Sequence, residues 1–362
     1  MASEHIPVPP LALCGLGAST PVGRTAWASA AAVRAGLTGF AEHDFMVDSV
    51  GAPMRVAACP WLSGEPDVHA RMVACLIDAV REAMQPLATV AEDDAAAKPT
   101  LLVALPPERP GLEPDLVARV EAGLHASFPN AFSRVVPIRR GHAAGLLGLA
   151  AVAKAVNRAP GGSYVVAGTD SWLDPDTLEW LEETGQLHGA GPANNAWGFI
   201  PGEAAGAVLI LGQSDADRLG LATFARLIGL GVGSEARLIR SGEVCLGLGL
   251  SDAVRGALST VPAGDHVTDI VCDMNGDPYR ADEFGFTITR TRERFVAPGD
   301  FIAPADCWGD VGAASALLAA VLATIAMRKA YANGEVSLVW ASSDAGERGA
   351  AVLIGERGPE HS

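Results

Sequence analysis

The clearest chemical candidate in this sequence is a histidine at the start of a long apolar segment. His142 stands in Gly141-His142-Ala143-Ala144-Gly145, and the residues from there to about Arg158 are nearly all Ala, Leu, Gly and Val. A helix that is apolar on every side is buried, so its first turn presents unpaired N–H groups and a positive dipole end to the interior. An imidazole there could act as a general base or contact a ligand, and the dipole would favour its neutral form. It could equally fill space and bond to a neighbouring loop.

Further polar residues precede a second apolar segment, residues 313–327. Cys307 is either a replacement nucleophile or an ordinary buried thiol. Asp310 is either a ligand contact or a carboxylate that caps the helix dipole. Asn275, which stands before a glycine at the end of an expected strand, is either a hydrogen-bond donor for the site or a plain turn residue.

Four more residues are candidate ligand contacts. Arg139 and Arg140 together could bind a phosphate group, although such a pair is commonly solvated or salt-bridged. Ser343 and Asp344 end the strand that follows the second apolar helix. The remaining histidines show no metal-ligand spacing. We therefore expect neither a metal nor a cofactor.

The elements that position these residues occur twice along the chain. Each apolar helix is followed by a short apolar strand, and each half closes on Ala-Val-Leu-Ile, at residues 207–210 and 351–354. Each half also opens on a strand with a Gly-Leu-Gly sequence, at residues 15–17 and 229–231. When the two segments are aligned so that His142 matches Gly309, Gly145 also matches Gly312. We interpret this order as an internal duplication, with one half at residues 1–215 and the other at 216–362, whose two buried helices start at one shared site.

Composition limits the possible functions. The net charge of −16 argues against binding to nucleic acid or to an anionic membrane surface. Six cysteines without C-x-x-C spacing favour reduced core thiols in a cytoplasmic protein. Residues 311–327 are rich in Ala and shorter than the about 20 residues that cross a bilayer, so no membrane insertion is expected. The N-terminal residues show no signal peptide.

Three motifs resemble the thiolase-like superfamily, specifically the β-ketoacyl-acyl-carrier-protein synthases. Residues 15–23, Gly-Leu-Gly-Ala-Ser-Thr-Pro-Val-Gly, are similar to the opening strand and turn of that family. Residues 198–207, Gly-Phe-Ile-Pro-Gly-Glu-Ala-Ala-Gly-Ala, resemble its G-F-x-x-G-E-G-A-G-A stretch, and residues 310–315 resemble the segment after its second catalytic histidine. The resemblance implies an α/β fold with two duplicated halves in five αβαβα layers. It also implies a homodimer or a heterodimer with a synthase-like protein, and an acyl carrier protein or acyl-thioester as a possible partner.

The catalytic residues of that family are absent at the matching positions. His142 takes the place of the nucleophilic cysteine, Asn275 that of the first histidine, and Gly309 that of the second histidine. The expected lysine is missing from residues 301–306, and residues 344–348 replace the family's Gly-Phe-Gly-Gly loop. Condensation needs a thiolate that accepts the acyl chain and two donors that stabilise an enolate. We therefore expect that the chain does not condense acyl groups.

Three functions remain open from the sequence. The first is a non-condensing binding or scaffold subunit, analogous to a chain-length factor or an accessory protein of another assembly. The second is an acyltransferase or thioesterase acting on an acyl-thioester, with His142 as base and Asn275 positioning the substrate. The third is a binder of a small molecule in a former acyl tunnel, for which an open cavity beside His142 is required. Whether the chain is an enzyme stays uncertain at this stage.

Overall fold

The computed structural model describes residues 4–355; residues 1–3, where no signal peptide is expected, and residues 356–362, the end of the predicted second half, lie outside this range. The strands of the main sheet are β1 (Glu4–His5), β2 (Leu11–Ser19), β5 (Thr100–Leu105), β6 (Arg134–Arg139), β7 (Ser163–Ser171), β8 (Glu203–Gly212), β9 (Ala225–Ser234), β10 (Asp269–Cys272), β11 (Val336–Ser342) and β12 (Glu347–Gly355). They form one ten-stranded mixed sheet in the order β10-β11-β12-β9-β2-β8-β7-β5-β6, with β1 paired to β9. A separate hairpin consists of β3 (Ala41–Val47) and β4 (Pro53–Val56).

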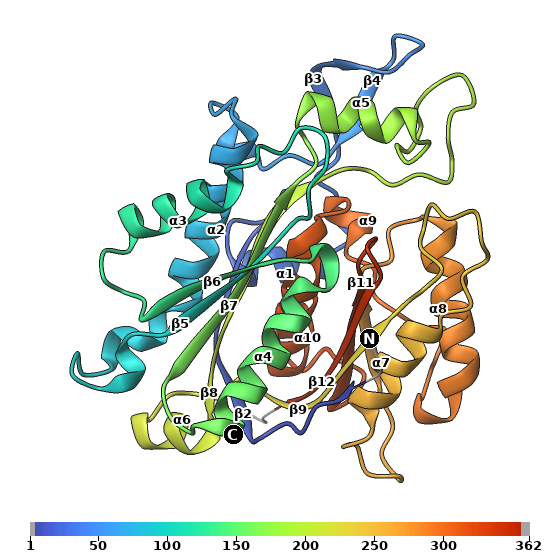
Figure 1. Cartoon of the computed structure of the whole chain (residues 1–362). Helices are drawn as coiled ribbons and strands as arrows, with labels where there is room; N and C mark the ends of the chain where they lie inside the picture. The colour runs from blue at the N-terminus through green and yellow to red at the C-terminus, as the bar shows by residue number, and fades with distance from the viewer. Residues whose placement is uncertain (1–3, 356–362) are drawn as a thin grey trace.

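The helices lie on both faces of this sheet. They are α1 (Ala26–Arg34), α2 (Val68–Ala83), α3 (Leu116–Ser127), α4 (Ala144–Arg158), α5 (Pro175–Glu183), α6 (Gln213–Leu219), α7 (Leu248–Leu258), α8 (Pro278–Thr291), α9 (Ala305–Trp308) and α10 (Ser315–Arg328). Helices α4 and α10 lie at the centre, between the two parts of the sheet, with α2 and α3 outside one part and α7 and α8 outside the other (Figure 1). This is the five-layer αβαβα arrangement predicted from the sequence.

The strand order of the first half is repeated in the second. β2 and β8 pair antiparallel, as do β9 and β12, while β5–β7 and β10–β11 are parallel pairs. In the first half β6 adds a strand parallel to β5, whereas the corresponding edge of β10 carries only a single parallel bridge between Val271 and Ile302. The boundary expected after residue 215 falls inside α6, the short helix between β8 and β9. That boundary stays a prediction.

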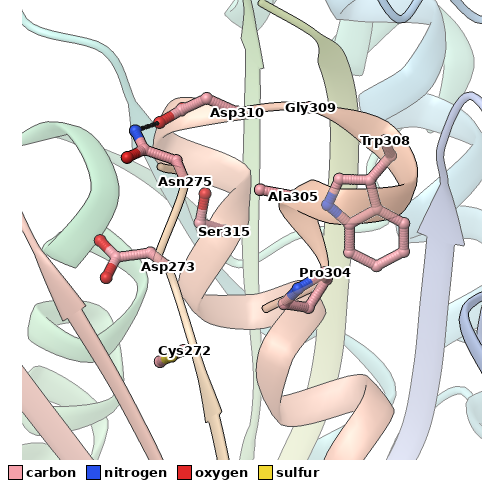
Figure 2. A pocket seen from close by; sticks show the side chains of 9 residues that line it. All are labelled: Cys272, Asp273, Asn275, Pro304, Ala305, Trp308, Gly309, Asp310 and Ser315. Carbon is pink, nitrogen blue, oxygen red and sulfur yellow. Dashed lines mark hydrogen bonds between the residues drawn. The ribbon is translucent and has the colours of Figure 1, made fainter. Parts of the chain in front are cut away.

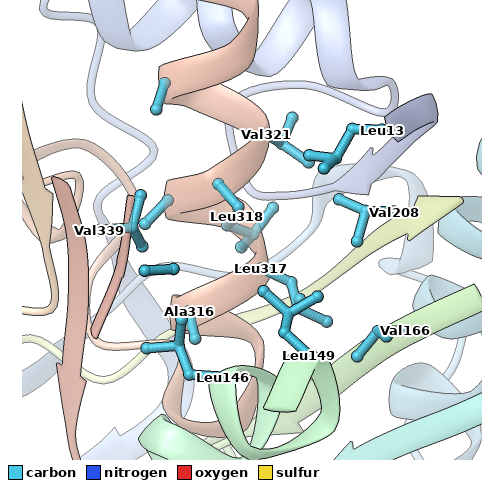
Figure 3. Packing of buried hydrophobic residues seen from close by; sticks show 14 of the residues in the cluster. Leu13, Leu146, Leu149, Val166, Val208, Ala316, Leu317, Leu318, Val321 and Val339 are labelled. Atoms are coloured by element: carbon cyan, nitrogen blue, oxygen red, sulfur yellow. The ribbon is translucent and has the colours of Figure 1, made fainter. Parts of the chain in front are cut away.

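Helices α4 and α10 form the central layer because almost every side chain in them is apolar. Leu146 and Leu149 of α4 and Leu317 and Leu318 of α10 pack together in the largest core cluster, which also takes in Val166 and Val208 of the sheet (Figure 3). A Cβ on Gly145 would lie 2.8 Å from Cγ of Leu317, so glycine lets the two helices approach closely. Among residues 4–355, no helix is long and apolar enough to cross a membrane.

The repeated Gly-Leu-Gly sequences have a packing role. A Cβ on Gly15 or Gly17 of β2 would lie 2.0 or 1.9 Å from a backbone carbonyl oxygen of α2. A Cβ on Gly229 or Gly231 of β9 would meet a carbonyl oxygen of α7 at 2.1 or 1.9 Å. In each half, therefore, the outer helix lies directly against the strand backbone at positions where no side chain fits.

The starts of the two central helices match each other, but not at the residues that the sequence comparison paired. Each helix follows a single 3₁₀ turn, Gly141–Ala143 (η4) before α4 and Gly312–Ala314 (η6) before α10. Both turns begin on a glycine with positive φ, +64° at Gly141 and +48° at Gly312. The structural counterpart of Gly312 is therefore Gly141, and pairing His142 with Gly309 was wrong. The inserted helix α9, which has no counterpart before α4, accounts for the shift.

Candidate functional site

The candidate site centres on Asp310, whose buried carboxylate joins four separate segments of the chain. Oδ1 accepts hydrogen bonds from His142 Nε2 at 2.8 Å, from Trp172 Nε1 at 3.1 Å and from the backbone N–H of Gly312 at 2.8 Å. Oδ2 accepts from Asn275 Nδ2 at 2.6 Å, the bond dashed in Figure 2. Three residues predicted from the sequence, His142, Asn275 and Asp310, thus meet at the starts of the two central helices.

His142 and Asp310 form a buried ion pair. Burial lowers the pKa of His142, but the Asp310 carboxylate opposes this effect, and the pKa lies above its ordinary value. Burial raises the pKa of Asp310, but the charge and hydrogen bond of His142 outweigh burial and hold it well below its usual range. The expectation that the helix dipole keeps His142 neutral was therefore wrong, because a carboxylate 168 positions away in sequence lies beside the imidazole.

A second buried cation, Arg280, lies beside the same nitrogen of the imidazole. Its Nη2 is 3.3 Å from His142 Nε2, and its Nη1 donates to Asp273 Oδ2 and to the carbonyl oxygen of Ser342, both at 2.7 Å. Asp344 lies 3.4 Å from Nη2. The site is therefore a network of largely buried charges, in which two neighbouring cations each face at least one carboxylate.

Side chains of the protein also occupy the positive ends of both central helices. Asp170, at the end of β7, accepts from the backbone N–H of Ala313 at 2.9 Å, and Ser343, after β11, accepts from that of Ala143 at 2.9 Å. Asp170 is itself paired with Arg109 at 2.6 Å, and the guanidinium of Arg109 lies 3.8 Å from the centre of the Trp172 ring. The N–H groups of Ala143, Gly312 and Ala313, which could otherwise stabilise an external anion, are therefore already bonded within the chain.

Little space remains at this network. The cavity lined by Asn275, Gly309 and Asp310 measures about 10 Å³, about the size that holds one water molecule. Gly309 has φ +74°, and a Cβ there would lie 2.5 Å from the carbonyl oxygen of Ile200. Any larger residue at position 309, a histidine included, requires the backbone around Ile200 to move.

The cysteines of the chain are buried thiols. Burial raises the pKa of Cys14 to about 12 and also raises those of Cys272 and Cys307. Cys272 lines the small cavity, but its Sγ is directed to the carbonyl oxygen of Ile302 at 3.8 Å. The pKa of Cys307 is raised further by Asp306. Neither thiol has the lowered pKa of a nucleophilic cysteine.

The two arginines before His142 point to other groups. Nε of Arg139 donates to the carbonyl oxygen of Pro106, and its guanidinium lies 3.6 Å from Glu108. Arg140 is exposed and lies 3.5 Å from Glu347. Both arginines are thus salt-bridged, the alternative that the sequence left open beside phosphate binding.

Five residues of the network were missed by the sequence analysis. Asp170 lies at the end of β7 and Asp273 directly follows β10, and a polar residue at the end of an apolar strand is a signal that the sequence does carry. Trp172 lies two residues beyond Asp170. Arg109 and Arg280 carry no comparable signal, because one lies in a proline-rich loop and the other inside the first turn of α8.

One further group in the described residues has the composition of a metal site. Glu235, Cys245 and Glu283 each place a ligand atom within 4.8 Å of the other two. However, Glu283 is ion-paired with Arg348 at 2.5 Å, and Glu235 accepts from the backbone N–H groups of Ala236 and Gly249. Three of the four carboxylate oxygens are bonded in this way, whereas Oε2 of Glu283 has no partner among the described residues, and the positive charge of Arg348 beside Glu283 opposes a bound cation.

Comparison with known proteins gives a fold relationship. No family model matches the chain, and no curated protein matches it. The ishigamide ketosynthase/chain length factor superposes with a TM-score of 0.76 at 15% identity, over 96% of this chain and 100% of that one. A chain of the AntDE:AntF complex, a type II PKS acyl-carrier protein with its ketosynthase bound to the hexaketide, gives 0.74 at 15% identity, over 96% and 100%. A β-ketoacyl synthase from Burkholderia phymatum STM815 gives 0.71 at 14% identity, over 96% and 100%. The chain therefore has the fold of these ketosynthases, the thiolase-like fold.

Proposed function

We propose that this protein is a non-condensing, cytoplasmic ketosynthase-like subunit that acts by binding a partner protein. The observation that carries the proposal is the position of the Asp310 carboxylate, which lies at the start of α10 and is ion-paired with His142. A condensing enzyme needs a thiolate and free hydrogen-bond donors at this place. In this chain the Asp310 carboxylate and the His142 imidazole occupy these places and bond to each other.

The dimensions of the site support the same conclusion. An acyl chain needs a cavity far larger than one water molecule, since ligand pockets typically measure about 300–1,000 Å³. The cavity beside Asn275 and Asp310 measures about 10 Å³. This packing also disfavours the third function considered from the sequence, a small molecule held in a former acyl tunnel.

The state of His142 bears on the alternative of an acyltransferase or thioesterase. A general base must be neutral and within reach of the proton it removes. Nε2 of His142 faces both oxygens of Asp310, at 2.8 and 3.0 Å, and the imidazole is buried at 4% exposure, so this nitrogen is out of reach of a substrate proton. We therefore do not adopt hydrolysis or acyl transfer as a second function.

The partner that we propose is a synthase-like protein, in a heterodimer, with a homodimer as the alternative assembly. One solved relative in fold is described as a ketosynthase/chain length factor, and another as a ketosynthase in complex with an acyl-carrier protein. The net charge of −16 opposes a direct complex with an acidic carrier protein, which favours the synthase as the partner.

An acylation experiment tests the absence of condensing chemistry. The purified protein is incubated with acyl- and malonyl-thioesters, and its intact mass and free thiol release are followed beside an active ketosynthase. We expect no covalent adduct and no turnover. Turnover that His142→Ala abolishes and that the exposed control His125→Ala retains would overturn the proposal.

A binding experiment tests the partner. Sedimentation equilibrium is measured for the purified chain alone and mixed with a ketosynthase from the same source. We expect a complex with one copy of each protein. A chain that stays monomeric, both alone and in the mixture, contradicts a subunit role.

A further inference from the structure

A groove on another part of the molecule has the composition of a binding site. It measures about 570 Å³ and lies between α1 and the C-terminal end of α10. Trp27, Ala31 and Arg34 line it from one face of α1, Ile325 lines it from α10, and Lys329 lines it from the position directly after α10. Asp310 lies before the opposite end of α10, a helix of 14 residues and thus about 20 Å long. The groove is therefore separate from the His142 network.

The walls of the groove combine cations with aromatic rings. The guanidinium of Arg34 lies over the ring of Tyr331, 4.4 Å from its centre, and Nζ of Lys329 lies 5.2 Å from the centre of the Trp27 ring. Within residues 4–355, neither cation has a carboxylate within 4 Å, although the chain carries a net charge of −16. Each cation lies at the end of a helix, where it complements the dipole. That role does not account for an open apolar floor between them.

We propose that this groove binds a small amphiphilic anion, with an aliphatic or aromatic body and one carboxylate or phosphate head. The head would lie between Arg34 and Lys329, whose positive charges have no acidic partner among the described residues. The body would contact Ile325, Ala31 and the exposed edge of Trp27, which is 39% exposed. The volume lies within the range of small-molecule pockets, about 300–1,000 Å³. This site does not depend on the proposed function.

The test uses three probes that share an eight-carbon chain: octanoate, octan-1-ol and octylammonium. Binding to the full-length protein is measured by calorimetry and by tryptophan fluorescence, with Trp27→Phe identifying the signal from the groove. We expect octanoate to bind at least tenfold more tightly than octan-1-ol, and octylammonium not to bind. Octyl phosphate, used in parallel, distinguishes a phosphate head from a carboxylate.

Charge-neutral variants assign the head group to its contacts. The double variant Arg34→Gln/Lys329→Gln is expected to lose at least tenfold in octanoate affinity while keeping the affinity for octan-1-ol. The matched control, Arg158→Gln/Arg292→Gln, removes two exposed cations elsewhere and is expected to bind octanoate like the wild type.

Three results would overturn this assignment. One is equal affinity for octanoate and octan-1-ol, or no binding of octanoate or octyl phosphate. Another is unchanged octanoate affinity in the double variant. The third is self-association that the double variant abolishes in sedimentation experiments, since this would make the groove an interface with a second copy of the chain.

Discussion

Replacing Asp310 by asparagine removes the charge at the centre of the site while keeping the side chain's shape. An asparagine offers one acceptor oxygen in place of two and adds an amide that faces the donors His142 Nε2 and Asn275 Nδ2. It also leaves the imidazolium beside Arg280 without its counter-charge. Breaking a buried ion pair by removing one partner typically costs about 3–5 kcal/mol. We expect Asp310→Asn to lower the free energy of unfolding by that amount.

The loss is measured by urea unfolding, followed by circular dichroism and tryptophan fluorescence so that coincident transitions justify a two-state analysis. Asp306→Asn is the matched control, because Asp306 is exposed and its carboxylate makes no hydrogen bond or ion pair within residues 4–355. Its cost should stay within about 0.5 kcal/mol. The double variant His142→Gln/Asp310→Asn removes both charges, so it should lose less than the sum of the two single variants.

An Asp310→Asn variant within about 1 kcal/mol of the wild type would refute this reasoning, since a buried pair cannot lose one charge at so small a cost. Additive costs in the double variant would refute the pairing itself. Either result would also remove the main support for the proposed non-condensing function.

Three other changes test separate parts of the site. Because the folded-state pKa of His142 is raised, the stability that the His142–Asp310 pair contributes is complete below about pH 6.5 and is lost as pH rises through that raised value. The urea midpoint should therefore fall more between pH 6 and pH 9 in the wild type than in His142→Gln. An equal fall in the two proteins would contradict this. Gly309→Ala should lower the free energy of unfolding by about 1–3 kcal/mol. This is more than the cost of the control Gly36→Ala, whose Cβ meets no atom within 4 Å. Equal costs would show that position 309 has room for a side chain. Cys307 should resist iodoacetamide in the native protein and react after unfolding, as mapped by peptide mass, because burial raises its pKa; rapid native labelling would contradict a buried thiol.

Much of the fold could be predicted because apolar runs and glycine positions are local signals. The run from Ala143 predicted α4, and residues 313–327 predicted α10, each close to its observed bounds. The repeated landmarks predicted two duplicated halves, and the sheet repeats the strand order of the first half in the second. The register between the halves was wrong, since helix α9 inserts residues that sequence spacing alone does not show.

The site was predicted only in part. His142 and Asp310 were found because each stands at the start of an apolar helix, and Asn275 because it precedes a glycine at a strand end and falls near a motif position of a known family. The duplication predicted that the two helix starts share one site, but not that His142 and Asp310 pair across it, since 168 positions separate them. Arg280 was missed for a related reason: an arginine in a helix is usually solvated, and only the packing of α8 against the core buries this one.

The glycines of β2 and β9 have a consequence for how this chain tolerates change. Since helix backbone touches strand backbone at Gly15 and Gly17, and again at Gly229 and Gly231, even a methyl group at any of the four would push an outer helix off its sheet. A saturation mutagenesis map should therefore show two matching pairs of intolerant positions, one in each copy of the ancestral unit. The presence of two similar halves has in this respect doubled the number of positions that tolerate no side chain, because neither half can compensate for a substitution in the other.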